Sequence, residues 1–101
     1  MNDDMKKIAR LREEIDRLDV ELVKLLNRRA RLADEIGTIK RKLNLPVYVP
    51  GREAQVIANV QKHNPGPLRA AAIARLYERI IDESRRLEQE NYLNRMQERD
   101  V

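Results

Sequence analysis

The chain has 101 residues, of which 38% are charged, yet its formal net charge is only +4 because acids and bases are interleaved. This length supports one domain over residues 1–101, and such a charge balance permits nucleic-acid binding without requiring it. The absence of cysteine excludes disulfides and thiolate nucleophiles, and the single histidine, His63, cannot build a metal site alone. We therefore expect no metal and no cofactor.

The opening segment contains no apolar run of the kind found in secretory signals, and nowhere do 18 apolar residues follow one another. We therefore expect a soluble, cytoplasmic protein without a membrane span. Because the chain has no Trp or Phe, its core must come from aliphatic side chains and methionine, which suits packed helices.

Residues 6–42 are predicted to form one long helix, because they contain no proline and only one glycine, Gly37. Such a helix is about 55 Å long, whereas a compact domain of about 100 residues has a radius of gyration near 13 Å. Its apolar residues recur in a 4,3,4,3 rhythm, which we call the apolar seam. The rest of the chain is too short to cover this seam, so we expect a homodimer. The seam consists of Leu11, Ile15, Leu18, Leu22, Leu25, Leu32, Ile36, Ile39 and Leu43.

Two further helices are predicted after proline-containing breaks, a short one over about residues 51–62 and a long one over about 68–95. Pro67 suits the first position of the third helix, and the tail at 94–101 is expected to fray. The predicted fold is therefore all-α, with three helices per chain that intertwine with those of a second copy.

Arg29 occupies one position of the repeat that forms the apolar seam, where a hydrophobic residue is expected. Lys40 follows eleven residues later, about 20° around the helix and about 16 Å along it, so the two cations share a face and leave room for a small anion. The alternative is a structural ion pair of Arg29 in the core. Arg12 lies about 25 Å from Arg29 along the helix and could serve only the site of a partner chain in a two-fold dimer.

The shorter helices add four polar candidates: Arg52, Glu53, Ser84 and Glu88. Glu53 also suits a capping role in the first turn of its helix, and Ser84 and Glu88 share the apolar face of the third helix. Two or three cations, one hydroxyl and two carboxyls inside a helical bundle suit a small polyanion that carries a hydroxyl. They also suit chemistry that depends on placement and electrostatics rather than on covalent catalysis.

The sequence resembles the all-α class of chorismate mutase, an intertwined dimer that converts chorismate to prephenate in phenylalanine and tyrosine biosynthesis. The resemblance runs through "LREEIDRLDVELVKLLNRRARLADEIGTIK", "LPVYVPGREAQVI", "NPGP" and "IIDESRRLEQ", in that order. It implies a small-molecule substrate, an enzyme of the isomerase class and a homodimer, with neither nucleic acid nor membrane as a partner. Docking to a larger enzyme of the shikimate pathway is left open.

The resemblance also implies roles for the cations. Arg29, together with Arg12 from the other subunit, would bind the two carboxylates of chorismate. Lys40 would donate to the ether oxygen and to a carboxylate, and Arg52 would add positive potential. The pericyclic step breaks the C–O bond ahead of C–C bond formation, so that donors fixed at the ether oxygen gain strength in the transition state.

The remaining implied roles belong to three side chains. Glu53 would accept a hydrogen bond from the ring hydroxyl, and Ser84 would contact the ring carboxylate. Glu88 would stand at the ether oxygen opposite Lys40. The expected catalytic residues are therefore Lys40, Glu88 and Arg29.

Three positions depart from the pattern that many members of this family share. Glu88 stands where many members have Gln, and a carboxylate there would repel the developing oxyanion unless it is protonated. Burial would raise its pKa while Lys40 would lower it, so the sequence leaves the sign open. Val49 stands where many members have Asp and cannot cap the following helix with its side chain, and Gly51 loosens the same turn.

Three alternatives remain at this point. Isochorismate-pyruvate lyase shares the fold and the cationic clamp, although Glu53 favours the mutase, and mutases that act on 4-amino-4-deoxychorismate are related. A basic helical module could instead bind nucleic acid through "NRRARLADEIGTIKRK", although Asp34 and Glu35 interrupt its bases and no aromatic side chain is available there for stacking. A coiled-coil interaction module predicts that Arg29→Leu stabilises the dimer without loss of activity.

Overall fold

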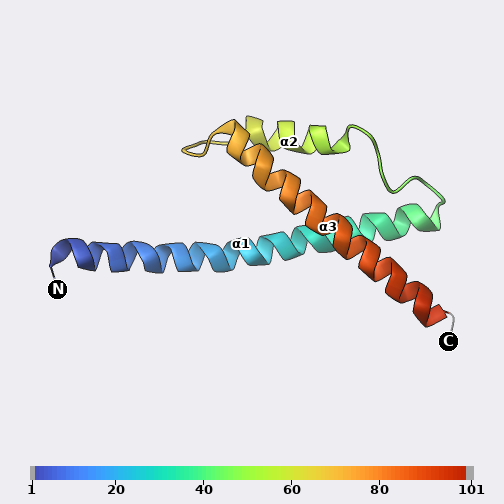
Figure 1. The fold of residues 1–101 in the computed structure, drawn as a ribbon, viewed down its shortest axis with the longest axis horizontal. Helices are drawn as coiled ribbons and strands as arrows, with labels where there is room; N and C mark the ends of the chain where they lie inside the picture. Colours follow the sequence, from blue (N-terminus) through green and yellow to red (C-terminus); the bar gives the residue numbers. More distant parts are fainter. Residues whose placement is uncertain (1, 100–101) are drawn as a thin grey trace.

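The computed structural model describes residues 2–99, which form three α-helices and no strand. They are α1 (Asp3–Lys42), α2 (Arg52–Lys62) and α3 (Ala70–Arg99). In Figure 1, α3 crosses α1 in the C-terminal third of α1, and α2 runs beside the first half of α3. The predicted all-α fold with one very long, one short and one long helix is confirmed for a single chain.

Helix α1 begins earlier than the predicted residue 6, because Asn2 caps it. The side-chain oxygen of Asn2 accepts a hydrogen bond from the amide of Met5 at 2.8 Å, and Asp3 and Asp4 place negative charge in the first turn. At the other end, the amide of Leu43 still bonds to the carbonyl of Ile39, and the chain then turns through Asn44, whose φ is +56°. The predicted C-terminal end at residue 42 agrees with the structure.

The N-terminal part of α1 extends beyond the other two helices (Figure 1). The chain measures 64 × 34 × 15 Å, and its radius of gyration is 18.7 Å, well above the value of about 13 Å for a compact chain of this length. All nine residues of the apolar seam are exposed, by 48% for Leu11 and up to 60% for Leu43. The single chain therefore leaves the seam uncovered.

Helix α2 begins at Arg52, one residue later than predicted. Gly51 precedes it in a left-handed conformation with φ of +85° and offers no side chain for capping. The amide of Arg52 instead donates to the carbonyl of Val49 at 3.2 Å, so that position 49 supports the turn through its backbone. Glu53 lies in the first turn, where its charge interacts favourably with the helix dipole.

Two predictions about α3 are wrong. The helix begins at Ala70 rather than at residue 68, and Pro67 lies in the preceding turn rather than at the first helical position. The reason is Asn64, whose side chain accepts from the amide of Gly66 at 3.1 Å and donates to the carbonyl of Leu68 at 2.6 Å, which holds the turn open as far as Leu68. Residues 94–99 of the C-terminal tail are helical, residues 100 and 101 lie outside the described part, and fraying of this tail stays a prediction.

The buried core of the described chain is small and lies where α1 and α3 cross. Gly37 is the buried residue of α1, and Ile81 and Ser84, exposed by 8% and 7%, are those of α3. At this crossing the side chain of Glu88 lies against Gly37, where a Cβ atom would be 3.4 Å from its Oε2. This crossing also forms one wall of the cavity described below.

Candidate active site

A cavity of about 670 Å³ lies between α1, α2, α3 and the segment that joins α1 to α2. It contains six of the seven residues predicted from the sequence to form a site: Arg29, Lys40, Arg52, Glu53, Ser84 and Glu88. Its apolar walls come from side chains such as Ile36, Val47, Val56 and Ile81. Residues up to 63 positions apart in the sequence, Arg29 and Tyr92, therefore share one pocket.

The predicted pair of cations on α1 lies on the pocket wall. Arg29 and Lys40 are both half-buried, and the guanidinium of Arg29 lies 5.9 Å from the ring centre of Tyr77 on α3. Within residues 2–99 Arg29 forms no ion pair, so the alternative of a structural pair finds no acid in this chain. The ammonium of Lys40 is 3.5 Å from the carbonyl of Val47, a long contact that leaves donors available to a ligand.

Helix α2 contributes Arg52 and Glu53 from its first turn. The carboxylate of Glu53 pairs with Arg85 of α3 at 3.3 Å, and the same guanidinium lies 5.3 Å from the ring centre of Tyr48. Arg85 therefore joins α3 to α2 and to the preceding segment. Since both partners are partly exposed, this pair contributes orientation more than stability.

Helix α3 places Ser84 and Glu88 one turn apart on the pocket side. The carboxyl of Glu88 lies across the backbone of α1, and a Cβ atom added to Gly37 would be 3.4 Å from its Oε2. Gly37 thus allows Glu88 to reach the pocket between the two helices.

The structure settles the direction of the pKa shift that the sequence left open for Glu88. Burial of its carboxyl is the largest influence and raises its pKa above the ordinary value of 4.5. The negative charge of Asp34 adds to this increase, whereas the cations Arg41, Arg85 and Lys40 oppose it. The net effect favours the protonated acid, which can donate a hydrogen bond.

Arg12 is the one predicted site residue that the single chain does not bring to the pocket. It is exposed in the N-terminal third of α1, and it does not line the cavity. This position agrees with the expectation that Arg12 cannot serve the pocket of its own chain.

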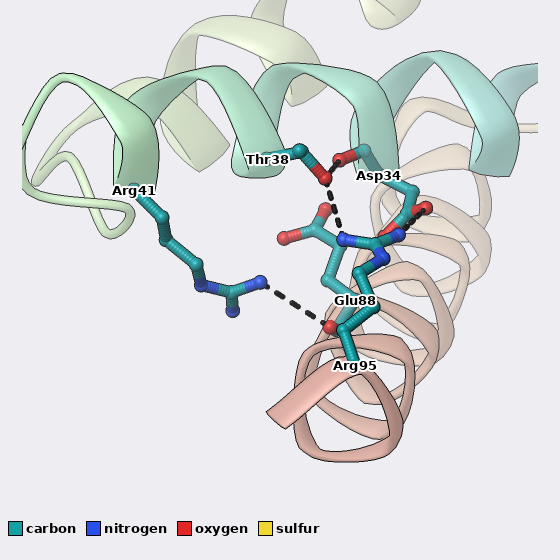
Figure 2. Close-up of polar contacts among 5 residues, drawn as sticks. All are labelled: Asp34, Thr38, Arg41, Glu88 and Arg95. Atoms are coloured by element: carbon teal, nitrogen blue, oxygen red, sulfur yellow. Dashed lines mark hydrogen bonds and ion pairs between the residues drawn. The ribbon is translucent and has the colours of Figure 1, made fainter. Parts of the chain in front are cut away.

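The sequence reasoning missed several residues that line the cavity. Arg41 stacks on Tyr92 with 4.1 Å between its guanidinium carbon and the ring centre, and it donates to the backbone carbonyl of Glu88 at 3.5 Å (Figure 2). Arg85, Tyr48 and Gln89 also face the cavity. Arg41 follows Lys40 directly, and Arg85 follows Ser84. Neighbouring residues on a helix point about 100° apart, so both members of each pair reach the pocket only because other elements pack around them.

The lining is strongly cationic. Arg29, Lys40, Arg41, Arg52 and Arg85 face two carboxyls, those of Glu53 and Glu88, and no histidine or cysteine lines the described pocket. Such a set is suited to bind a small dianion and to stabilise negative charge that develops during a reaction. In residues 2–99 no group of acidic, histidine or cysteine side chains is arranged to hold a metal ion, and no helix is long and apolar enough to cross a membrane.

Comparison with known proteins identifies relatives of the whole helical unit. The family model described as chorismate mutase type II matches residues 11–89. The bifunctional chorismate mutase/prephenate dehydratase of Aquifex aeolicus is 42% identical over 81 residues, which cover 76% of this chain and 22% of that protein. This chain spans about a fifth to a quarter of the length of the bifunctional relatives.

Two solved structures share the fold at substantial sequence identity. Chorismate mutase from Thermus thermophilus, in its form II, superimposes with a TM-score of 0.79 at 40% identity and covers 82% of this chain and 94% of that one. Chorismate mutase from Helicobacter pylori in complex with prephenate superimposes with a TM-score of 0.76 at 32% identity, covering 88% and 96%.

Proposed function

This chain belongs to the family of type II chorismate mutases, and we propose that its pocket converts chorismate to prephenate. The observation that carries this proposal is the gathering of Arg29, Lys40 and Glu88 around one cavity that contains neither histidine nor cysteine. Such a pocket can bind and orient a dianion without a covalent intermediate, which is what a unimolecular rearrangement requires.

The catalytic roles follow from the position of each group. Arg29 binds a carboxylate of the substrate and holds the enolpyruvyl group over the ring. Lys40 donates to the ether oxygen, where negative charge grows as the C–O bond breaks, so its hydrogen bond strengthens in the transition state. Glu88 donates to the same oxygen from the opposite wall as a neutral acid, in keeping with its raised pKa.

The other lining residues orient the substrate. Glu53 accepts a hydrogen bond from the ring hydroxyl, with Arg85 holding its carboxylate in place. Ser84 contacts the ring carboxylate, and Arg52 adds positive potential at the start of α2. The carbonyl of Val49 accepts a hydrogen bond from the amide of Arg52, and its side chain forms part of the apolar wall.

A second copy of the chain completes the site. The uncovered apolar seam runs along α1, and Arg12 lies on α1 well before Arg29, the first residue of α1 that lines the pocket. When two chains pair through their seams about a two-fold axis, Arg12 of each can enter the pocket of the other. It supplies the second carboxylate contact there.

The proposal also includes association with a larger enzyme. Several relatives are bifunctional proteins that combine a chorismate mutase with a prephenate dehydratase. We expect this chain to act next to an enzyme that consumes prephenate, whether covalently joined or docked.

The test is to incubate the purified protein with chorismate and, separately, with isochorismate, and to identify products by mass and by a pyruvate-coupled assay. Prephenate without pyruvate is the expected result with chorismate. Pyruvate and salicylate from isochorismate would assign the chain to the lyases instead. No turnover of either substrate would overturn the proposal.

A further inference from the structure

Arg95, two turns beyond Glu88 on α3, reaches back to α1 with both ends of its guanidinium. One Nη donates to the hydroxyl of Thr38 at 2.7 Å, and the other pairs with Oδ2 of Asp34 at 3.0 Å. The hydroxyl of Thr38 in turn donates to the backbone carbonyl of Asp34 at 3.1 Å. These three residues, which we call the Arg95 clamp, form a closed network at the crossing (Figure 2).

The clamp and the Glu88 carboxyl occupy the same contact face between the two helices. On α1 this face is formed, at helical spacing, by Asp34, Gly37, Thr38 and Arg41, and on α3 by Glu88, Tyr92 and Arg95. Since the carboxyl of Glu88 lies against Gly37, a small rotation or slide of α3 would move it. The ion pair and hydrogen bond of the clamp oppose such a movement, together with the contacts of Arg41 to α3.

Asp34 has an unusual place in this network. Its side chain is only 17% exposed, and its second oxygen, Oδ1, is buried without a hydrogen-bond partner among the described residues. An unpaired buried oxygen is costly, so Asp34 depends on its contact with Arg95. The charge of this carboxylate also acts on Glu88 and raises its pKa.

We propose that Arg95 is a positioning residue for Glu88, which it serves by fixing α3 against Asp34 and Thr38 and by compensating the charge of Asp34. This inference rests on the proposed function in so far as Glu88 contacts the reacting atoms. Arg95 itself does not line the larger cavity and acts only through the two helices that it joins.

Other charged groups surround Glu88 and stay unchanged in the test. Lys40 and Arg41 face it from α1, Arg85 lies on α3 itself, and Arg52 and Glu53 face the shared cavity from α2. Since these groups are the same in every variant below, a change in the titration of Glu88 reports on the clamp.

The experiment follows the titration of Glu88 directly, by NMR of the full chain labelled with ¹³C at the glutamate side-chain carboxyl and assigned with Glu88→Gln. Arg95→Met leaves the charge of Asp34 uncompensated, so we expect Glu88 to titrate at a higher pH than in the unaltered protein. Asp34→Asn removes the like charge and leaves Arg95 unpaired, so Glu88 should titrate at a lower pH. Shifts in opposite directions would show that the charge balance of the clamp acts on Glu88, and the turnover measurement below tests whether the clamp also positions its carboxyl.

Turnover of chorismate supplies the second measurement. We expect Arg95→Met to lower kcat on the order of tenfold with KM within about twofold, because the carboxyl is displaced while the cations that bind the substrate remain. Arg95→Lys keeps the charge but cannot bridge both partners. In this variant the pH at which Glu88 titrates should be close to that of the unaltered protein, whereas kcat should stay lowered.

The matched control is Arg79→Met, which removes an arginine from an exposed ion pair with Glu83 within α3. It should leave both the titration and kcat unchanged. Titration shifts in the same direction for Arg95→Met and Asp34→Asn, or no shift in either, would overturn the proposal. Because the titration needs no substrate, it tests the clamp even when chorismate is not turned over, a result that would count against the proposed function alone.

Discussion

The carboxyl of Glu88 has a pKa raised mainly by its own burial, although three cations lie near it. A neutral carboxyl donates to the ether oxygen, whereas an ionised one repels the charge that develops there. Its competent form is therefore fully present at pH values below its pKa and is lost as the pH rises through that value.

We therefore predict that kcat falls as the pH rises through the pKa of Glu88, and that Glu88→Gln flattens this profile because the amide donates at every pH. The measurement is the pH dependence of prephenate formation for both proteins. Glu90→Gln, at an exposed position of α3, is the control. An unchanged profile in Glu88→Gln would contradict the role of Glu88.

Gly37 allows a second prediction at the scale of one residue. Alanine at this position would place its Cβ 3.4 Å from Oε2 of Glu88, an ordinary contact, and alanine favours a helix by about 0.5–1 kcal/mol relative to glycine. Gly37→Ala should therefore preserve stability and keep kcat within a few-fold. Gly37→Leu must occupy the space of the Glu88 carboxyl and should lower kcat on the order of 100-fold. Equal activity in both variants, measured beside urea unfolding, would show that this contact does not position Glu88.

At the scale of the elements, the turn before α3 depends on one side chain. Asn64 makes two hydrogen bonds within this turn, so Asn64→Ala should lower the free energy of unfolding by about 1–2 kcal/mol. Urea unfolding at one fixed protein concentration measures the loss, with Asn94→Ala on the exposed side of α3 as the control. Equal stability of the two variants would show that the turn does not need Asn64.

The three helices and most of the pocket could be predicted from the sequence because their signals are local. The helix-forming run to residue 42, the prolines near residues 46 and 50, and the spacing of Arg29 and Lys40 all depend on near neighbours. The extension of α3 to Arg99 could not be predicted, because Arg95 is held by residues about 60 positions away. Arg41 and Arg85 were missed for the same reason, since only the crossing of the helices turns them toward the cavity.

At the scale of the whole molecule, the proposed dimer divides each site between two chains. Arg12→Ala and Lys40→Ala should each lose most of the activity, because each damages both sites of its own dimer. After the two variants exchange subunits at equal amounts, about half of the dimers are mixed, and each of these has one intact site. We predict recovery to about one quarter of full activity.

The measurement is turnover of chorismate before and after unfolding and joint refolding of the two variants, with mass spectrometry to verify the mixed dimers. Arg10→Ala, which alters an exposed arginine two residues from Arg12, should be fully active alone. Mixed dimers without recovered activity would show that Arg12 does not enter the partner's pocket.

Because the apolar seam of α1 is uncovered in one chain, the activity of the proposed dimer depends on the concentration of the protein. The seam is exposed along its whole length in one chain, so in the proposed dimer it becomes buried only when two chains meet. Assembly of such a protein is a second-order process, and its half-time shortens as more chains are made. Dilution would then dissociate the dimers and lower the activity per chain. A cell could therefore set this activity by the expression level alone, without any effector.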